Sequence, residues 1–288
     1  MFKISSQTHF LIQQALREDI GKGDITTRAL IPSSAIGKAR IEAKEAGILC
    51  GGPIVSEVFR QMDPKLKVFQ RIRDGAKVRK GQIVFLLRGR IKSILTAERV
   101  ALNFLSRLSG IATLTNKFVG KMRGAKAKIL DTRKTTPLWR ELERYAVRCG
   151  GGQNHRFGLW DEILVKDNHW QFVKSAQKMS HALQLTKRKG IPVEIEVAGL
   201  RQLERLLNQK FVPNRILLDN FSVSDLKKAV RMTRRARPKL LLEASGGITL
   251  SNVRQIAKIG VDRISIGALT HSAPALDFSL EISHVYEE

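Results

Sequence analysis

Basic side chains gather in short polar segments along the second half of the chain. Arg133 and Lys134 follow one apolar run, and Lys166 follows the next. Between them, a glycine-rich stretch contains His155 and Arg156. So many cations are costly to bury unless an anion neutralises them, because an unpaired charge loses its hydration. Guanidinium and ammonium groups bind carboxylates and phosphates through charge-assisted hydrogen bonds, so this group predicts a site for a polyanionic substrate.

Two carboxylates, Glu196 and Asp219, end later apolar runs. Carboxylate oxygens hold Mg²⁺ directly or through water. A fixed carboxylate also stabilises positive charge that develops on a sugar during a reaction. Ion pairing with neighbouring lysine and arginine side chains is the purely structural alternative. From the residues alone, all three interpretations remain open.

Two turns that contain glycine follow the last two apolar runs. They are Ser245-Gly246-Gly247 and Ile266-Gly267-Ala268. Glycine lets backbone N–H groups approach phosphate oxygens, and the late strands of parallel barrels often bind phosphate in this way. A Ser-Gly-Gly turn alone is weak support, since ordinary turns have the same composition. Its position after a late strand is what favours a phosphate site.

Six short apolar runs must position these polar residues. They cover residues 127–130, 162–165, 191–195, 215–218, 239–242 and 262–266. Each run is followed by a stretch able to form a helix, and this repeat predicts a parallel sheet in an α/β barrel. The carboxyl ends of parallel barrel strands share one face, where active sites are found. We therefore expect the cations, carboxylates and glycine turns to meet there.

The first third of the chain predicts a different, mixed domain. A helix is expected from Ser6 to about Asp19, and alternating apolar and polar residues predict strands over residues 38–44 and 83–89. Residues 74–81 resemble the hairpin of lipoyl-type carrier domains. No lysine lies in an Asp-Lys-Ala turn there, so a structural hairpin is the preferred interpretation.

A helical pattern from Thr96 to about Phe118 joins the two parts, with an interruption expected at Gly110. The expected domains are therefore residues 1–109, an α/β sandwich with the joining helix, and residues 110–288, the barrel. The last segment of the chain is a candidate to pack back on the first domain.

The composition is strongly basic, with 51 lysines and arginines against 26 aspartates and glutamates and a net charge of +25. Such a charge raises the alternative of a nucleic-acid-binding protein. The basic residues are scattered through helical segments, without a basic tail or an aromatic-basic repeat, so a solvated basic face is the preferred interpretation. We expect no specific nucleic-acid partner.

Compartment and redox state follow from what the sequence contains. The apolar runs are far shorter than the ~18 residues that span a bilayer, and the first residues do not form the apolar core of a signal peptide. Two cysteines, Cys50 and Cys149, are too few for a disulfide framework. The sequence thus predicts a protein of the reducing cytoplasm without membrane association.

Long ordered motifs closely resemble the quinolinate phosphoribosyltransferase family over nearly the whole chain. The motifs are DTRKTTP at 131–137, ERYAVRCGGGQNHRFGL at 143–159, LVKDNH at 164–169, GKGDITT at 21–27, TAERVALN at 96–103, SGGI at 245–248 and IGALT at 266–270. The resemblance implies an amino-terminal α/β sandwich followed by an incomplete parallel α/β barrel. It also implies that quinolinate and phosphoribosyl pyrophosphate react with Mg²⁺ to give nicotinate mononucleotide, pyrophosphate and carbon dioxide in NAD biosynthesis.

The resemblance further implies roles for individual residues. Substrate would contact Thr132, Arg133, Lys134, His155, Arg156, Lys166, Glu196 and Asp219, with Lys134, Glu196 and Asp219 catalytic. Glu196 and Asp219 would serve the metal and the ribose, and the two glycine turns would bind the 5′-phosphate. The family assembles at least as a dimer, so Arg99 would reach into the partner subunit's site.

The chain departs from the family pattern in two places. Leu138 stands where the family usually has glycine, and a positive φ there would strain the turn. The polar pair expected after Glu196 is replaced by Val197-Ala198-Gly199. Neither change removes a residue assigned to chemistry. A paralogue that does not decarboxylate, such as a nicotinate phosphoribosyltransferase or a molybdenum-operon relative, is the alternative enzyme.

Overall fold

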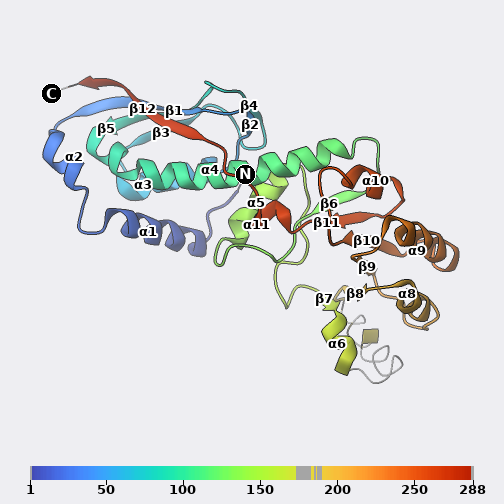
Figure 1. The fold of residues 1–288 in the computed structure, drawn as a ribbon. Coiled ribbons are helices and arrows are strands. Elements are labelled where there is room, and N and C mark those ends of the chain that lie inside the picture. Colours follow the sequence, from blue (N-terminus) through green and yellow to red (C-terminus); the bar gives the residue numbers. More distant parts are fainter. Residues whose placement is uncertain (1, 173–182, 185, 187–189, 287–288) are drawn as a thin grey trace. The chain divides into compact units, whose positions relative to one another are not determined.

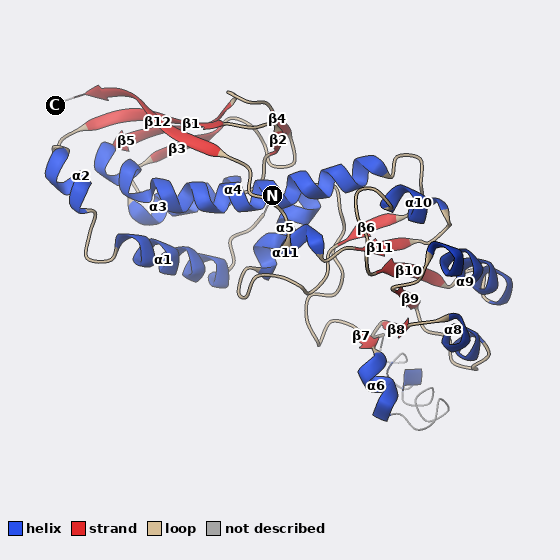
Figure 2. Ribbon diagram, viewed as in Figure 1, coloured by secondary structure: helices blue, strands red, loops and turns tan. Residues whose placement is uncertain are grey.

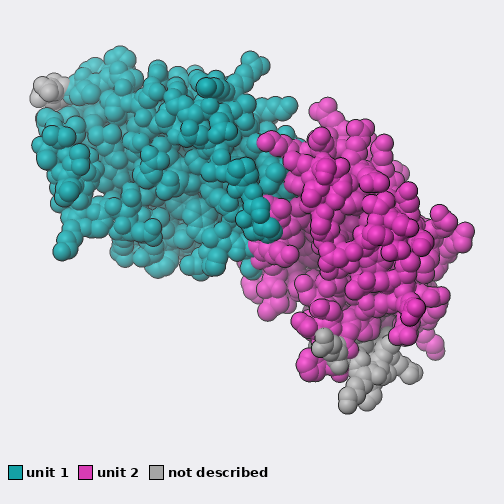
Figure 3. All heavy atoms as spheres, viewed as in Figure 1, with its two compact units in different colours: residues 1–116, 135–151, 269–288 teal, residues 117–134, 152–268 magenta. Residues whose placement is uncertain are grey.

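The computed structural model describes residues 2–172, 183, 184, 186 and 190–286. The chain forms two compact units (Figure 3). The first contains residues 1–116, 135–151 and 269–288, and the second contains residues 117–134 and 152–268. Each unit is thus assembled from segments that are separated in the sequence.

The first unit contains a four-stranded sheet and the helices that cover it (Figure 1). Its strands are β1 (Ile36–Ala43), β3 (Lys67–Gln70), β5 (Ile83–Arg90) and β12 (Phe278–Tyr286). The order β12-β1-β5-β3 is antiparallel throughout. The helices are α1 (Ser6–Ile20), α2 (Ile25–Leu30), α3 (Gly52–Met62), α5 (Arg140–Cys149) and most of α4 (Ile91–Lys121). Figure 2 shows α3 and α4 along one side of the sheet.

Local sequence explains these elements. In β1, Ala39, Ile41 and Ala43 are buried and alternate with more exposed residues, as expected for a strand with one face on a core. Helix α1 begins after Ser5, whose hydroxyl accepts a hydrogen bond from the Thr8 N–H at 3.1 Å. The predicted first helix and both predicted strands are confirmed. The residue that caps the helix is Ser5, and Ser6 is the first residue of the helix itself.

The interruption expected at Gly110 is wrong, because α4 is one continuous helix from Ile91 to Lys121. A β-carbon on Gly110 would collide with the carbonyl oxygen of Pro274. Glycine is therefore needed for close packing of another segment against the helix, and it does not mark a break. The helix also runs through the position at which the sequence suggested a domain boundary, residues 109 and 110.

The hairpin expected at residues 74–81 is also wrong. Within this segment only β4 (Lys77–Val78) is a strand, and it pairs with β2 (Gly47–Ile48). Asp74 instead serves the start of α3, since its carboxylate accepts hydrogen bonds from the N–H groups of Gly51 and Gly52 at 2.8 and 3.0 Å.

The second unit contains an open sheet of six parallel strands (Figure 1). They are β6 (Lys128–Leu130), β7 (Ile163–Val165), β8 (Val193–Val197), β9 (Arg215–Asp219), β10 (Leu241–Ser245) and β11 (Arg263–Ser265), in the order β6-β11-β10-β9-β8-β7. All six predicted strands are confirmed, and so is the α/β fold class. The helices are α6 (Asp167–Phe172), α8 (Leu200–Leu207), α9 (Val223–Ala236) and α10 (Val253–Lys258), and α11 (Ala268–His271) leads back to the first unit.

No helix in the described part of the chain is both long enough and apolar enough to cross a membrane.

Candidate active site

Strand register brings the predicted carboxylates and the first glycine turn to one edge of the parallel sheet. Asp219 ends β9 opposite Ser245, the last residue of β10. Ser245 is also opposite Ser265, the last residue of β11. Glu196 lies near the end of β8, opposite Leu217. Because side chains alternate along a strand, Glu196 and Asp219 belong to the same face of the sheet.

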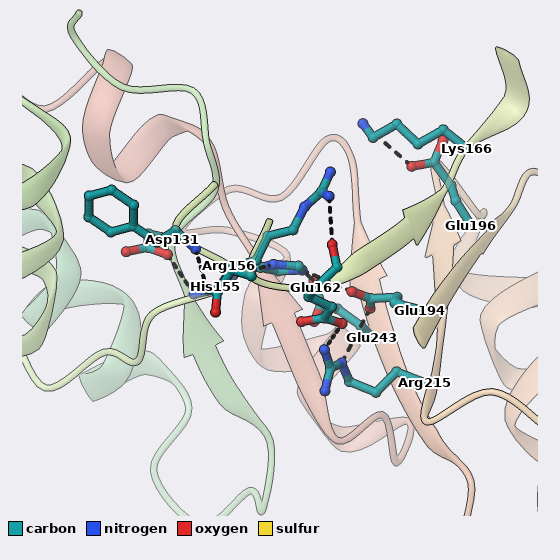
Figure 4. A network of polar contacts seen from close by, with 11 residues as sticks. Asp131, His155, Arg156, Glu162, Lys166, Glu194, Glu196, Arg215 and Glu243 are labelled. Atoms are coloured by element: carbon teal, nitrogen blue, oxygen red, sulfur yellow. Dashed lines mark hydrogen bonds and ion pairs between the residues drawn. The ribbon is translucent and has the colours of Figure 1, made fainter. Parts of the chain in front are cut away.

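Glu196 and Asp219 form a like-charged pair beside a lysine. The Glu196 side chain is 14% exposed, and its Oε2 lies 3.7 Å from Nζ of Lys166 (Figure 4). Burial raises the pKa of Glu196; Lys166 opposes this rise, while the charge of Asp219 adds to it. Lys166 is half exposed, so its contact with Glu196 contributes little stability. The pair is therefore suited to accept a further cation.

Asn220 supports this edge, and the sequence did not single it out as a site residue. Its Nδ2 donates a hydrogen bond to Oδ2 of Asp219 at 2.8 Å, and its N–H donates to the Ser245 carbonyl at 2.9 Å. Its φ is 55°, a conformation that asparagine tolerates better than most residues. A β-carbon on Gly246 would collide with the Asn220 side chain, and the φ of Gly246 is 87°. Glycine is thus required at position 246 of this turn.

The second glycine turn leads from β11 into α11. Ile266 is buried and its N–H donates to the Leu130 carbonyl at 3.0 Å, which ties the turn to the end of β6. Gly267 and Ala268 are partly exposed at the same sheet edge. Both predicted phosphate turns therefore lie after neighbouring parallel strands.

The basic segment after β6 is held by Asp131. This carboxylate is fully buried and accepts hydrogen bonds from the His155 N–H at 2.7 Å and from the Asn154 side chain (Figure 4). It thereby joins the end of β6 to the loop that contains two of the predicted donors. Next to it, Thr132 accepts a hydrogen bond from the Lys134 N–H at 3.1 Å, and the Lys134 side chain is exposed.

Arg156 and Arg133 lie close enough to repel each other. Arg156 is 8% exposed, and its Nη1 donates to the Glu162 carbonyl at 3.0 Å. Burial lowers the pKa of Arg156, and the positive charge of Arg133 lowers it further. Two neighbouring guanidiniums, one of them buried, form the kind of arrangement that binds a carboxylate or phosphate.

His155 points into a buried cluster of charged side chains (Figure 4). Its Nε2 lies 3.1 Å from Oε2 of Glu194 and 3.3 Å from Oε1 of Glu243, and its side chain is 7% exposed. Burial lowers the pKa of His155, but hydrogen bonds to Glu194 and Glu243 outweigh this and raise the pKa to about 9. Burial also raises the pKa of Glu194. Nδ1 accepts a hydrogen bond from the Arg156 N–H at 2.7 Å, so the ring proton lies on Nε2, where it faces the two carboxylates.

Arg215 completes this cluster on β9. Its Nη2 pairs with Glu162, and its Nε lies 3.8 Å from Oε1 of Glu194. His155, Glu162 and Glu194 present three metal-type ligand atoms within 4.8 Å of one another, but the Arg215 guanidinium already supplies positive charge there. This cluster could have been found in the sequence from charged residues that lie within the apolar runs. Glu194, for example, lies two positions before Glu196 and therefore on the same face of the strand.

Two further residues of the recognised motifs complete the description. His169, the last residue of the LVKDNH motif, accepts a hydrogen bond at Nδ1 from the Lys166 N–H at 2.9 Å. Arg99 belongs to α4 in the first unit, where its side chain is exposed. The other predicted substrate, metal and phosphate residues all lie in the second unit.

Comparison with known proteins gives matches over almost the whole chain. The profile of the quinolinate phosphoribosyl transferase N-terminal domain matches residues 24–109, and that of the C-terminal domain matches residues 111–281. A nicotinate-nucleotide pyrophosphorylase [carboxylating] from Mycobacterium leprae is 41% identical over 276 residues, which covers 94% of this chain and 95% of that protein. A probable one from Synechocystis is 39% identical over 271 residues, covering 94% and 91%.

Solved structures agree. The nicotinate-nucleotide pyrophosphorylase from Francisella tularensis has a TM-score of 0.89 at 40% identity and covers 98% of both chains. NadC from Streptococcus pyogenes has a TM-score of 0.91 at 36% identity, covering 99% of this chain and all of that one.

Proposed function

Because the chain belongs to the quinolinate phosphoribosyltransferase family, we infer that it transfers the phosphoribosyl group of phosphoribosyl pyrophosphate to quinolinate and releases carbon dioxide. The products are nicotinate mononucleotide and pyrophosphate, in NAD biosynthesis. The observation that supports this most directly is the presence of two like-charged pairs beside the parallel strands. Glu196 and Asp219 act on each other near the ends of β8 and β9, and Arg133 acts on the buried Arg156.

The reaction separates charge in a direction that suits this edge. The pyridine nitrogen bonds to the anomeric carbon while the bond from that carbon to pyrophosphate breaks. Positive charge grows on the ribose and negative charge on the leaving group. We assign Glu196 and Asp219 to the ribose side and the basic residues to the anions, because fixed charges of this kind stabilise the transition state more than the ground state.

The basic residues have two anionic partners to hold. We assign Arg133, Arg156 and Lys166 to the two quinolinate carboxylates, and Lys134 to the pyrophosphate. His155 and Asp131 position the segment that contains Arg156. The His155 ring contacts Glu194, and the Asp131 carboxylate accepts a hydrogen bond from the His155 N–H. Loss of carbon dioxide then needs no protein nucleophile. The electron pair of the broken bond stays on the ring carbon, where the adjacent positively charged nitrogen stabilises it, and a proton from solvent then adds to that carbon.

Mg²⁺ fits the carboxylate pair. Both side chains are hard oxygen donors. Burial raises the pKa of Glu196 and the like charge of Asp219 adds to that rise, and a bound cation would offset both effects. Mg²⁺ usually binds one or two carboxylates together with substrate phosphates, and when bound it would neutralise charge on the pyrophosphate. Ser245, Gly246, Gly247 and the 266–268 turn are the proposed ligands of the 5′-phosphate.

We further propose that the enzyme acts in the cytoplasm as a homodimer or higher even oligomer. In this arrangement Arg99, exposed on α4, enters the partner's site. The proposed partners are the two substrates, and no nucleic acid or membrane partner is included.

The test is release of carbon dioxide from carboxyl-labelled quinolinate. We expect release that depends on both phosphoribosyl pyrophosphate and Mg²⁺ and that stops with a chelator. Nicotinate is the matched control substrate, since it lacks the carboxylate that leaves. Equal or better consumption of phosphoribosyl pyrophosphate with nicotinate would identify the paralogue that does not decarboxylate. Glu196→Gln is expected to abolish turnover, whereas Glu204→Gln, on an exposed face of α8, is expected to leave it unchanged.

A further inference from the structure

The two cysteines, distant in sequence, lie side by side in the first unit. Cys50 immediately precedes the residue that caps α3, and Cys149 is the last residue of α5. Their sulfur atoms lie within 4.8 Å of each other. Cys50 is fully buried and firmly held, since its N–H donates to the Ser109 hydroxyl at 3.0 Å and its carbonyl accepts from that hydroxyl at 3.1 Å.

We propose that Cys50 and Cys149 form a reversible disulfide when the protein meets a hydroperoxide. A disulfide requires sulfurs about 2.05 Å apart, so the two must approach by at most about 3 Å. Cys50 is fixed in the core, whereas Cys149 ends a helix, so most of the movement falls on Cys149. The N–H groups of the adjacent Gly150 and Gly151 donate to Ala146 and Arg148 of α5, and the Gly150 carbonyl accepts a hydrogen bond from the Asn116 side chain at 3.4 Å.

The two thiols differ in access and in pKa, and the reaction with peroxide requires both differences. Cys149 lines a pocket of about 470 Å³ with Arg73, Asp74, Tyr145 and Arg148, so a small oxidant can reach it. The hydrogen bond with Cys50 lowers the pKa of the Cys149 thiol, whereas burial raises the pKa of Cys50. Cys149 is therefore the attacking sulfur and Cys50 the resolving one.

The reaction balances with hydrogen peroxide as the oxidant. The Cys149 thiolate attacks one peroxide oxygen, the O–O bond breaks, and hydroxide leaves, which gives a sulfenic acid. The Cys50 sulfur then attacks the Cys149 sulfur, its proton goes to the departing oxygen, and water leaves. Both sulfurs are oxidised by one electron each, and the peroxide is reduced to two waters.

A metal site is the competing interpretation of the same cluster, because Asp74 adds a third ligand atom within 4.8 Å of the sulfurs. The Asp74 carboxylate is already occupied. It accepts hydrogen bonds from the Gly51 and Gly52 N–H groups and from the Tyr145 hydroxyl at 2.6 Å. Metal binding would break the start of α3, whereas the disulfide leaves these contacts intact.

A short segment of the chain links Cys149 to the candidate active site. The segment from Gly150 to Gly152 runs directly from Cys149 to Asn154 and His155, which Asp131 holds. A β-carbon on Gly150 would collide with the Ala112 carbonyl, so the segment is closely packed at its start. Movement of Cys149 must therefore be taken up by the residues that follow. We expect oxidation to lower turnover, and this second effect alone rests on the proposed function.

The decisive experiment maps thiols in the wild-type chain, so it does not depend on a variant that folds. The protein is treated with hydrogen peroxide, remaining thiols are alkylated, and peptides are separated before and after dithiothreitol. We expect a peptide pair joined through Cys50 and Cys149 that dithiothreitol releases. Both cysteines alkylated, or Cys149 oxidised beyond the sulfenic acid without a joined peptide, would overturn the proposal.

Variants separate the two roles. Cys50→Ser is expected to leave a Cys149 sulfenic acid that a dimedone probe captures, and Cys149→Ser is expected to leave Cys50 alkylated after the same treatment. Sulfenic acid on Cys50 instead would contradict the assigned order. In the activity assay, wild-type turnover should fall at least severalfold on oxidation and return with dithiothreitol, while Cys149→Ser is unaffected. A joined peptide with unchanged turnover would remove the connection to the site and leave the proposed function untouched.

Discussion

Lys134 and Lys166 follow different strands of the parallel sheet and are both exposed at its carboxyl edge. Loss of a charge-assisted contact with bound substrate worth ~2 to 4 kcal/mol reduces turnover by about 30- to 1,000-fold. Lys134→Ala and Lys166→Ala should each show such a loss, with unchanged thermal unfolding. Lys128→Ala is the matched control, because Lys128 is exposed at the start of β6, the opposite edge. Turnover like the control in either variant would remove that lysine from the site.

Leu138 has a φ of 66°, as the departure from the family pattern suggested, and its side chain is 69% exposed. A residue with a β-carbon in the left-handed conformation costs about 1 to 2 kcal/mol of folding free energy, and glycine removes this cost. Glycine also loses about 0.5 to 1 kcal/mol more backbone entropy on folding, which offsets part of the gain. Leu138→Gly should therefore raise the free energy of unfolding by up to about 1 kcal/mol in a urea titration. Leu159→Gly, at another exposed leucine without a positive φ, should give no gain. Equal effects would argue against backbone strain.

The His155 cluster makes stability depend on pH. Hydrogen bonds to Glu194 and Glu243 outweigh desolvation and raise the pKa of His155 from 6.5 to about 9, so the folded chain binds more protons than the unfolded chain. This contribution is complete below about pH 6.5 and is lost as pH rises through about 9, with a slope of up to about 1.4 kcal/mol per pH unit. The unfolding free energies of wild type and His155→Asn should therefore converge with rising pH. Parallel curves would show that His155 does not hold the proton.

At the level of elements, α4 allows a comparison of two glycines in one helix. A β-carbon at Gly110 meets the Pro274 carbonyl, whereas one at Gly120 meets nothing within 4 Å. Gly110→Ala should lower the free energy of unfolding by about 1 to 3 kcal/mol through overpacking. Gly120→Ala should raise it by up to about 1 kcal/mol through helix propensity. Calorimetry of both variants tests the pair, and a stabilised Gly110→Ala chain would contradict the packing role.

The strands of the parallel sheet could be predicted because apolar runs and polar ends repeat at a regular spacing. Gly110 was misread because glycine at a helix break and glycine at a close approach have the same local pattern, and only the distant Pro274 distinguishes them. The pairing of β4 with β2 was missed because the partner strand is distant in the sequence, and the local pattern does not identify it. In the site, Asp131 and Asn220 act on backbone groups of other segments, and such contacts leave no spacing in the sequence.

At the level of the whole molecule, the proposed dimer can be tested through Arg99. Mixed dimers of Arg99→Ala and Lys134→Ala chains contain one site that carries neither substitution. With random exchange about half of the dimers are mixed, so up to roughly a quarter of wild-type activity should return. A mixture of Lys134→Ala and Lys166→Ala chains is the control, because both residues belong to the same unit and should not complement. No recovery after demonstrated subunit exchange would place Arg99 outside the partner's site.

Strand β12 pairs with β1 along its whole length, although all six strands of the parallel sheet lie between them in the chain. During translation, β1, β5 and β3 leave the ribosome early but lack this neighbour until β11 has also emerged. The edge of β1 is therefore open for most of synthesis, and an open edge is where chains pair wrongly. The parallel sheet, by contrast, has all its strands before β12 is made. The domain whose synthesis begins first is thus the one whose sheet is completed last.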